Sequence, residues 1–439
     1  MANLLKPGQS LTVETGGLEC EVEALLGGGG QGEVYRISLG GKPFALKWYF
    51  SQQATHQQRK NLENLIRIGP PNDRFLWPES LVKAKGLPSF GYIMRLRPPT
   101  HKSLIDLMKR QVDVSFRTLT TTGLELAESF FQLHAKGLCY RDISFGNAFF
   151  DPSTGHVLVC DNDNVGVDNK SDALVEGTLG FMAPEIVTRR ARPSRQTDLF
   201  SLAVLLFYLL MIHHPLEGKR ESDIKCWDMP AKMKLYMTEP VFIFDPNDDS
   251  NRPVPGYHKN AIEFWPLYPQ SIRNLFIRSF TEGIRDPEHG RVVETEWRSA
   301  MVLLRDSIVY CAGCGAENFY DHGALKAGGQ LSACWHCKKP VDLPPRLRIA
   351  GSVIMLNHDT KLYPHHTDSS RGYDFAAPVG EVKQHPTKPQ LWGLKNLSDE
   401  KWVITSADGT VKDVEPQQSL TIANGTRISF GRVEGEIRA

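Results

Sequence analysis

The sequence predicts an α+β chain with three parts in succession. Two observations indicate the first part: a glycine-rich turn at residues 27–32 lies between strand-like segments, and an apolar run at residues 199–212 predicts a buried helix. Two cysteine pairs between residues 311 and 337 indicate a small second part. From residue 346 onward, short alternating segments separated by turns indicate a strand-rich third part.

Length and charge restrict the class of protein. A chain of 439 residues exceeds one hydrophobic core, so several domains are expected. The 51 basic and 50 acidic residues leave a net charge of +1, which argues against nucleic acid or a membrane surface as partner. The apolar run at 199–212 is shorter than the roughly 20 residues that a bilayer requires. Because no signal-peptide pattern is present, we expect a cytoplasmic protein.

The glycine-rich turn has the spacing of a hairpin that covers phosphates. Gly27, Gly29 and Gly32 fit G-x-G-x-x-G, and Val34 follows two residues later. Glycine permits close backbone approach, so the amides of such a hairpin can contact phosphate oxygens. Strand-like residues follow, whereas a dinucleotide-binding fingerprint would have a helix there. Successive glycines also suit a simple flexible turn, and both interpretations stay open at this motif.

A lysine within an apolar strand follows the turn. Residues 44–49 include Ala45 and Lys47 among apolar neighbours and predict a strand. A single lysine in a strand is most often solvated. Its position after the glycine-rich turn makes Lys47 the candidate cation for the α- and β-phosphates of a nucleotide.

Oxygen-bearing side chains follow one another between residues 142 and 164. Asp142 and Asn147 are five residues apart, and Asp161 follows after a hairpin-like stretch. This order suits phosphoryl transfer, because one carboxylate can orient a hydroxyl while an amide oxygen and a second carboxylate hold Mg²⁺ or Mn²⁺. The run at 161–164 can also be interpreted as a solvated turn rich in Asp and Asn.

Together with Tyr140-Arg141 before Asp142, Ala183-Pro184-Glu185 and Asp198, these segments resemble the eukaryotic-type protein kinases over about residues 15–305. The resemblance implies a bilobal protein-kinase fold over residues 1–305, with an N lobe at about 1–97 and a C lobe at about 98–305. The motifs that carry it, in chain order, are Gly27/Gly29/Gly32/Val34, Ala45-Leu46-Lys47, Tyr140-Arg141-Asp142 with Asn147, Asp161, Ala183-Pro184-Glu185 and Asp198.

The resemblance implies a transferase that uses ATP with Mg²⁺ or Mn²⁺ to phosphorylate serine or threonine hydroxyls of a protein substrate. Asp142 would orient the substrate hydroxyl, and Asn147 and Asp161 would hold the metal. Lys47 would hold the phosphates and pair with a helix glutamate. Glu63 is the only acidic residue between positions 47 and 73, and it is therefore the expected partner.

Other implied positions surround the nucleotide and support the scaffold. Residues 91–96 resemble the strand that enters the hinge, where backbone groups meet adenine. We expect Asp198 to hold the catalytic loop and Thr178 to help seat the substrate hydroxyl. The residues implied to contact the nucleotide are Gly27, Gly29, Gly32, Val34, Ala45, Lys47 and Met94, and the implied scaffold pair is Glu185 with Arg291.

Three positions depart from the family pattern. Ser144 stands where these kinases usually have lysine, Asn162 and Asp163 replace the Phe and Gly of the Asp-Phe-Gly triplet, and Tyr140 replaces histidine. Two hypotheses remain. The intact quartet of lysine, two aspartates and asparagine favours an active kinase, whereas Ser144 favours a nucleotide-binding pseudokinase that acts as a scaffold.

The cysteine pairs predict a zinc ribbon with its linker at residues 306–345. Cys311, Cys314, Cys334 and Cys337 have the spacing C-x₂-C-x₁₉-C-x₂-C. Four thiolates close a tetrahedral site without room for water, so this Zn²⁺ would be structural. Two disulfides are the alternative. The other four cysteines are scattered singly, and with the use of ATP this favours a reducing compartment and zinc.

Residues 346–439 predict a small β-sandwich. Residues 394–398 and 425–431 resemble the second half of forkhead-associated (FHA) domains, although the first half lacks a clear Gly-Arg phosphopeptide-reading pattern. An FHA-like reader of phosphothreonine and a sandwich used only for docking both stay open. The whole order resembles bacterial signalling kinases encoded with tellurite-resistance-type proteins, which implies a von Willebrand A-type partner and a metal-dependent phosphatase.

Overall fold

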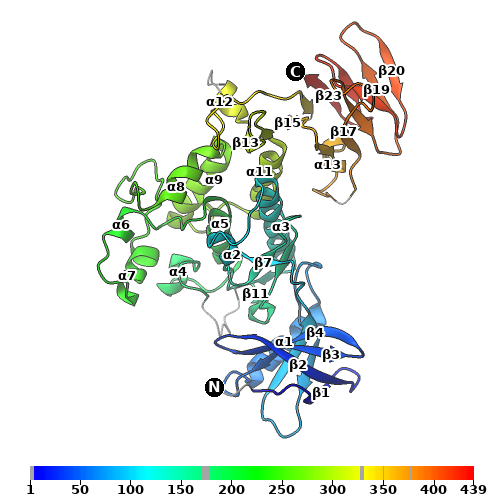
Figure 1. Cartoon of the computed structure of the whole chain (residues 1–439). Helices are drawn as coiled ribbons and strands as arrows, with labels where there is room; N and C mark the ends of the chain where they lie inside the picture. Colours follow the sequence, from blue (N-terminus) through cyan, green and yellow to red (C-terminus); the bar gives the residue numbers. More distant parts are fainter. Residues whose placement is uncertain (1–3, 170–176, 327–330, 350, 376) are drawn as a thin grey trace. The chain divides into compact units, whose positions relative to one another are not determined.

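The computed structural model describes residues 4–169, 177–326, 331–349, 351–375 and 377–439 (Figure 1). The chain divides into two compact units. Unit 1 contains residues 1–114, 121–262 and 275–298, and unit 2 contains residues 115–120, 263–274 and 299–439.

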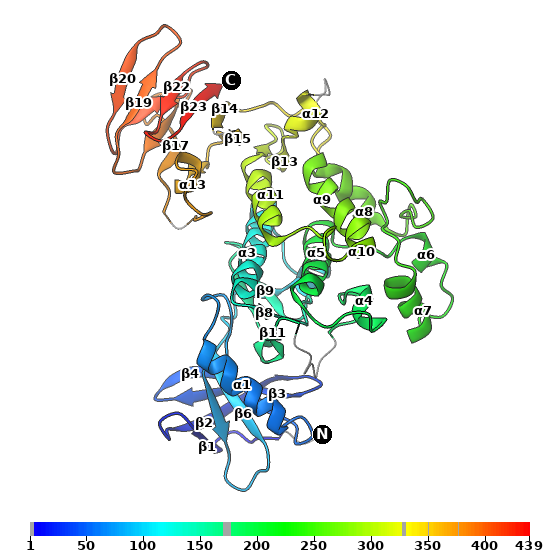
Figure 2. The same cartoon turned by 180° about the vertical axis from the view of Figure 1, so that it is seen from behind.

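The first strands of unit 1 form a closed antiparallel barrel in the order β1-β2-β3-β4-β6-β5. Its interior is apolar, with Val22, Leu46 and Ile93 among the buried side chains. The segment between β4 and β5 forms helix α1 (Figures 1 and 2). The bounds are β1 (Ser10–Val13), β2 (Glu19–Gly28), β3 (Gly32–Leu39), β4 (Lys42–Tyr49), α1 (His56–Ile68), β5 (Ser80–Lys83) and β6 (Phe90–Arg95).

Helix α1 follows from its cap and its periodicity. Thr55 precedes the helix, and its side chain accepts a hydrogen bond from the backbone N–H of Gln58, which satisfies one of the free donors of the first turn. Gln58, Leu62 and Leu65 are buried, and their spacing of four and three residues places them on one face. Glu63 is exposed. The rotation of the helix about its axis therefore turns Gln58 inward and Glu63 outward.

The remainder of the kinase-like region is mainly helical, with two small sheets in the orders β10-β9-β7 and β11-β8. Helices α3, α8, α9 and α11 contain the points at which the chain passes between the units. The strands are β7 (Lys102–Ser103), β8 (Leu138–Cys139), β9 (Ala148–Phe150), β10 (Val157–Val159) and β11 (Gly166–Val167); the helical elements are α2 (Leu104–Met108), α3 (Phe116–Ala135), the 3₁₀ turn η1 (Asn162–Asn164), α4 (Pro184–Val187), α5 (Arg195–Met211), α6 (Lys219–Ser222), α7 (Met229–Met233), the π-helical turn η2 (Lys234–Thr238), α8 (Lys259–Phe264), the 3₁₀ turn η3 (Trp265–Leu267), α9 (Gln270–Phe280), α10 (Glu282–Arg285) and α11 (Glu294–Asp306).

The apolar run expected as a buried helix is α5. Ser194 and Thr197 form a capping box at its start, and every residue from position 197 to position 211 is buried. A helix that is apolar on all sides suits the interior of a folded domain. In the part of the chain that the structure describes, no helix combines the length and the apolar character needed to cross a membrane.

The strands of unit 2 form a hairpin followed by two sheets. The sheets have the orders β15-β14-β23-β22-β19-β20 and β16-β17-β18-β21, and they share one apolar core that includes Leu347, Leu394 and Trp402. The elements are β12 (Ile308–Tyr310), β13 (Glu317–Phe319), α12 (His322–Lys326), β14 (Arg346–Ile349), β15 (Ser352–Met355), β16 (Lys361–Leu362), α13 (Pro364–Thr367), β17 (Gly380–Gln384), β18 (Trp392–Asn396), β19 (Trp402–Thr405), β20 (Val411–Val414), β21 (Ser419–Thr421), β22 (Arg427–Ser429) and β23 (Glu434–Arg438).

A turn interrupts a segment that is strand-like throughout in sequence. Within residues 349–356, β14 ends at Ile349 and β15 begins at Ser352. The two strands pair antiparallel, and Gly351 between them has a φ of +83°. A positive φ is costly for residues with a side chain, so the glycine allows the chain to reverse there.

Candidate active site

The loop between β8 and β9 holds the carboxylate of Asp142 in a defined orientation. The side-chain amide of Asn147 donates to the Asp142 backbone oxygen at 2.9 Å and to its Oδ2 at 3.1 Å. The Thr178 hydroxyl donates to Oδ1 at 2.6 Å. Burial raises the pKa of Asp142, although the hydrogen bonds from Thr178 and Asn147 act in the opposite direction. The loop therefore brings the predicted acceptor carboxylate next to a hydroxyl.

Helix α5 holds this loop through Asp198, as expected from the sequence. Asp198 accepts hydrogen bonds from the backbone N–H of Tyr140 and, at 2.9 Å, from that of Arg141. The Tyr140 hydroxyl donates to the backbone oxygen of Cys160, next to Asp161. Tyr140, which replaces the family histidine, thus connects the start of the catalytic loop to the chain that carries the second carboxylate.

A buried charged cluster supports Asp198 from behind. His134 lies 3.1 Å from Asp198 and also contacts Glu294, and Arg195 pairs with Glu294 at 2.6 Å. Burial opposes the charge of His134, but hydrogen bonds with the two carboxylates outweigh it and raise the pKa of His134 to about 9. Burial likewise opposes the charge of Glu294, but hydrogen bonds from His134 and Arg195 lower the pKa of Glu294 to about 2.

This cluster predicts how stability depends on pH. The contribution of His134 is complete below its ordinary pKa of 6.5 and is lost as the pH rises through about 9. The contribution of Glu294 is complete above 4.5 and is lost as the pH falls through about 2. We expect the stability gap between the wild type and His134→Gln, measured by urea unfolding, to narrow by about 3 kcal/mol between pH 6.5 and 10. A gap that does not change with pH would contradict a charged His134.

Lys47 on β4 lies in contact with the chain after β10. Its Nζ is 2.9 Å from Asp163 Oδ2 and 3.5 Å from Asp161 Oδ1, and it donates to Gln31 Oε1 at 2.9 Å. The side chains of Lys47, Asp163 and Asp161 are 6%, 0% and 40% exposed. Burial opposes the charge of Lys47, but the two carboxylates outweigh it and raise its pKa. The lysine is thus held as a buried cation at the end of the glycine-rich turn.

The expected pair between Lys47 and Glu63 is not formed among the described residues. Glu63 is 52% exposed in its side chain and pairs instead with Arg59 at 3.0 Å, one turn earlier in α1. The inward position of the helix is taken by Gln58. Glu63 was the only acidic candidate in the segment, but the phase of the helix directs it away from the lysine.

Three of the residues expected around the nucleotide, Val34, Ala45 and Met94, belong to one apolar cluster. Ala45 and Met94 are buried in a cluster with Leu158, and Val34 packs against it. Gly27 and Gly29 lie at the end of β2 and in the turn, where the N–H of Gly29 donates to the oxygen of Gly32 at 2.9 Å. An apolar wall next to backbone amides suits a base and its phosphates.

Gly32 is the position of this turn that requires glycine for reasons of space. A Cβ there would lie 2.1 Å from the backbone oxygen of Trp48 on β4, whereas a Cβ at Gly30 would meet nothing within 4 Å. We expect Gly32→Ala to destabilise the protein by about 1–3 kcal/mol through overpacking and to weaken nucleotide binding. Gly30→Ala is the matched control, and thermal unfolding with nucleotide titration compares the two. Equal behaviour of both variants would contradict the close approach.

The run at residues 161–164 is folded and not a solvated turn. Asp161 has a left-handed φ of 50° and precedes η1, and Asn162, Asp163 and Asn164 are buried. The amide of Asn162 donates to the backbone oxygens of Leu76 and Val159. Because Asp161 stays 40% exposed, its carboxylate and the side-chain oxygen of Asn147 fit a hard cation such as Mg²⁺ or Mn²⁺.

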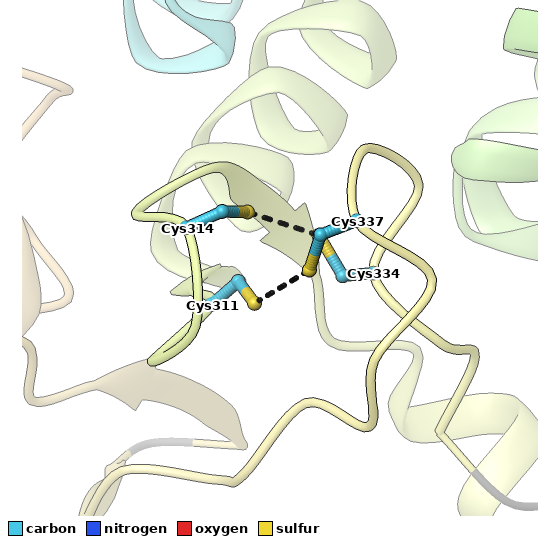
Figure 3. Close-up of side chains that lie close together, drawn as sticks. All are labelled: Cys311, Cys314, Cys334 and Cys337. Atoms are coloured by element: carbon cyan, nitrogen blue, oxygen red, sulfur yellow. Dashed lines mark hydrogen bonds between the residues drawn. The ribbon is translucent and has the colours of Figure 1, made fainter.

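In unit 2, the four cysteines of the two pairs converge (Figure 3). Their sulfur atoms all lie within 4.8 Å of one another. The Sγ–Sγ distances are 3.6 Å for Cys311 and Cys337 and 3.7 Å for Cys314 and Cys334. Zinc–sulfur bonds of about 2.3 Å give tetrahedral edges of about 3.8 Å, whereas a disulfide requires about 2.05 Å. The arrangement fits Zn²⁺ and does not fit disulfides.

The sequence profile described as "Protein kinase domain" matches residues 20–265, which is more than half of the chain. This chain belongs to the protein kinase family. The chain is 34% identical over 119 residues to ribosomal protein S6 kinase alpha-6 of Danio rerio, covering 26% of this chain and 15% of that protein. Ribosomal protein S6 kinase alpha-2 of Homo sapiens is 31% identical over 115 residues, covering 25% and 15%.

CBL-interacting protein kinase 4 of Oryza sativa subsp. japonica aligns over a longer stretch of the chain. It is 25% identical over 208 residues, which cover 43% of each chain. The chain therefore spans less than half the length of these curated relatives.

Sequence reasoning missed several residues of the kinase site. Gln31 contacts Lys47 and also donates to the Asn164 side chain at 3.2 Å, and Asp163 contacts Lys47 from the other side. The buried face of α1 could have been predicted from helical spacing, because positions 58, 62 and 65 lie on one face of the helix and Glu63 does not. No local pattern marks Asp163 as the partner, since the contact joins residues 116 positions apart.

Proposed function

We propose that this kinase is an ATP-dependent serine/threonine protein kinase that transfers the γ-phosphate to protein hydroxyls. The observation that supports it most directly is the hydrogen bond from Thr178 to Asp142, because it presents a carboxylate that already accepts from a hydroxyl. Asn147 holds the same carboxylate, and Lys47 lies beside Asp161. The relatives named as S6 kinases and as a CBL-interacting kinase agree with this class.

Each residue of the quartet has a proposed part in the transfer. Asp142 orients the acceptor hydroxyl and receives its proton, with Thr178 on the same carboxylate. Lys47 binds phosphate oxygens, which requires that the partly exposed Gln31 leave its ammonium group. Asn147 and Asp161 hold Mg²⁺ or Mn²⁺, which when bound offsets the negative charge of the phosphates.

Ser144 is the observation that favours a second candidate function. It is buried and supplies no positive charge where the family has lysine. A chain that binds nucleotide without turnover would be a pseudokinase scaffold. The two functions make the same prediction for nucleotide binding and opposite predictions for transfer.

The test is incubation of the full chain with labelled ATP and Mg²⁺ or Mn²⁺, with and without a generic basic protein substrate. We expect label on serine or threonine, located by mass spectrometry, and its loss in Lys47→Met. Arg36→Met is the matched control, because Arg36 pairs with Glu23 at the surface of the barrel. Nucleotide binding without any label in the wild type would favour the scaffold.

Beyond the kinase domain, we propose a zinc ribbon with its linker at 306–345 and an FHA-like sandwich at 346–439 that acts as an interaction module. Convergence of the four cysteines supports the first, and the two sheets around one core support the second. Phosphothreonine binding, a von Willebrand A-type partner, a metal-dependent phosphatase, and a place in bacterial cytoplasmic signalling belong to the same proposal and rest on the resemblance in domain order.

A further inference from the structure

We propose that Asp163 is the carboxylate that positions Lys47 for the phosphates of ATP, in the place that the sequence assigns to Glu63. The inference rests on the proposed kinase function and adds a positioning residue to its site. Asp163 belongs to η1, two residues after the exposed carboxylate of Asp161. One turn of chain therefore carries both the proposed metal ligand and the group that orients the lysine.

The carboxylate of Asp163 contacts Lys47 and two tyrosine hydroxyls. Lys47 lies 3.0 Å from its Oδ1 and 2.9 Å from its Oδ2. The Tyr92 hydroxyl donates to Oδ1 at 3.1 Å, and the Tyr49 hydroxyl donates to Oδ2. Burial and the charge of Asp163 raise the pKa of both phenols well above the ordinary value, so both remain donors. A carboxylate offers about four acceptor sites, and these contacts use all of them.

The other two partners of Lys47 are held less firmly. Asp161 is farther away, at 3.5 Å, and is 40% exposed, so water screens its attraction. Gln31 is neutral and only partly buried. An ammonium group has three donors. Asp163 keeps its contact because it is fully buried, while the donors directed at Gln31 and Asp161 become available to phosphate oxygens.

Helix α1, whose residues the structure describes throughout, supports Asp163 through hydrogen bonds and forms no ion pair with Lys47. The Gln58 amide donates to the Tyr49 hydroxyl at 3.0 Å and to the Asp163 backbone oxygen at 3.3 Å. The Asn61 amide donates to the same backbone oxygen at 3.0 Å. Two neutral amides of the helix thus fix the turn that carries the carboxylate. A change of charge at Glu63 should therefore leave Lys47 in place.

The experiment measures binding of a non-hydrolysable ATP analogue with Mg²⁺ to the full chain by calorimetry. We expect Asp163→Asn to weaken binding about tenfold, the size of a coupling between contacting residues. Glu63→Gln should bind like the wild type. Lys47→Met should also weaken binding, and the double variant Lys47→Met/Asp163→Asn should be no weaker than Lys47→Met alone, because Asp163 acts through the lysine.

Two further measurements separate positioning from folding. A merely unfolded fraction would lower the number of binding sites and kcat without raising the KM for ATP, whereas positioning raises the KM. Tyr92→Phe removes one donor to Asp163 but keeps the carboxylate charge. If Asp163→Asn does not fold, Tyr92→Phe should show the same rise in the KM for ATP, but a smaller one. Weakened binding in Glu63→Gln with unchanged binding in Asp163→Asn would overturn the inference. Unchanged binding in Lys47→Met would overturn the proposed role of Lys47 itself, and the inference with it.

Discussion

Asp142→Asn should lower the rate of phosphoryl transfer by about 10²–10⁴-fold, the contribution of a positioned acid or base. Asparagine keeps the shape of the side chain but cannot accept a proton. In the wild type, Asn147 and Thr178 donate hydrogen bonds to the carboxylate and orient it. The measurement is the initial rate of label transfer at saturating ATP, together with the affinity for nucleotide.

The nucleotide affinity of Asp142→Asn distinguishes a catalytic defect from a folding defect. Because Lys47 and the apolar wall around Ala45 are unchanged, the variant should bind ATP like the wild type. Asp113→Asn is the matched control, since Asp113 is exposed. A variant that transfers phosphate at the wild-type rate would assign the reaction to another group. A parallel loss of nucleotide binding would indicate a folding defect instead of a catalytic one.

Cys334→Ser should abolish zinc binding and unfold the segment around the ribbon. Cys334 and Cys311 are buried with Val309, Tyr320 and Val341 in a small core. A segment of this size buries little apolar surface, and structural zinc supplies about 10–16 kcal/mol in comparable small domains. Loss of one thiolate should therefore remove most of the free energy that holds residues 306–345 together.

Metal content and limited proteolysis check this prediction. The wild type should contain one zinc per chain and resist cleavage within residues 306–326 and 331–345, whereas Cys334→Ser should lack zinc and be cut there. Cys226→Ser, at an exposed cysteine outside the cluster, should behave like the wild type. A wild-type chain without metal, or a variant with full zinc content, would contradict the site.

Much of the kinase site could be predicted because its motifs are local. Asp142 and Asn147, which are five residues apart in the sequence, form a direct hydrogen bond in the structure. Asp198 could be placed because it begins an apolar run whose burial is nearly complete. The expected scaffold pair of Glu185 and Arg291 also forms, at 2.7 Å. The contact between Asp142 and Asn147 follows from their spacing, whereas the roles of Asp198, Glu185 and Arg291 were implied by the resemblance to protein kinases.

The partner of Lys47 could not be predicted in this way. Composition left Glu63 as the only acidic residue in the segment, and that reasoning ignored the direction in which each side chain leaves the helix. In the structure, Gln58 faces inward and Glu63 pairs with Arg59. The apolar periodicity of α1 contained this information, because Leu62 and Leu65 mark the buried face.

The sequence by itself determined the features that depend on neighbours along the chain: the glycine spacing, the order of the catalytic residues and the cysteine pairs. Tertiary structure alone decided which carboxylate meets Lys47. That choice required β4, β6 and η1 to come together, so that Tyr49 and Tyr92 surround Asp163 in a buried site. The physical reason is burial: a buried ammonium group requires a partner that is excluded from water with it. Exposed Glu63 does not meet that requirement, and Asp163, 116 residues from the lysine, does.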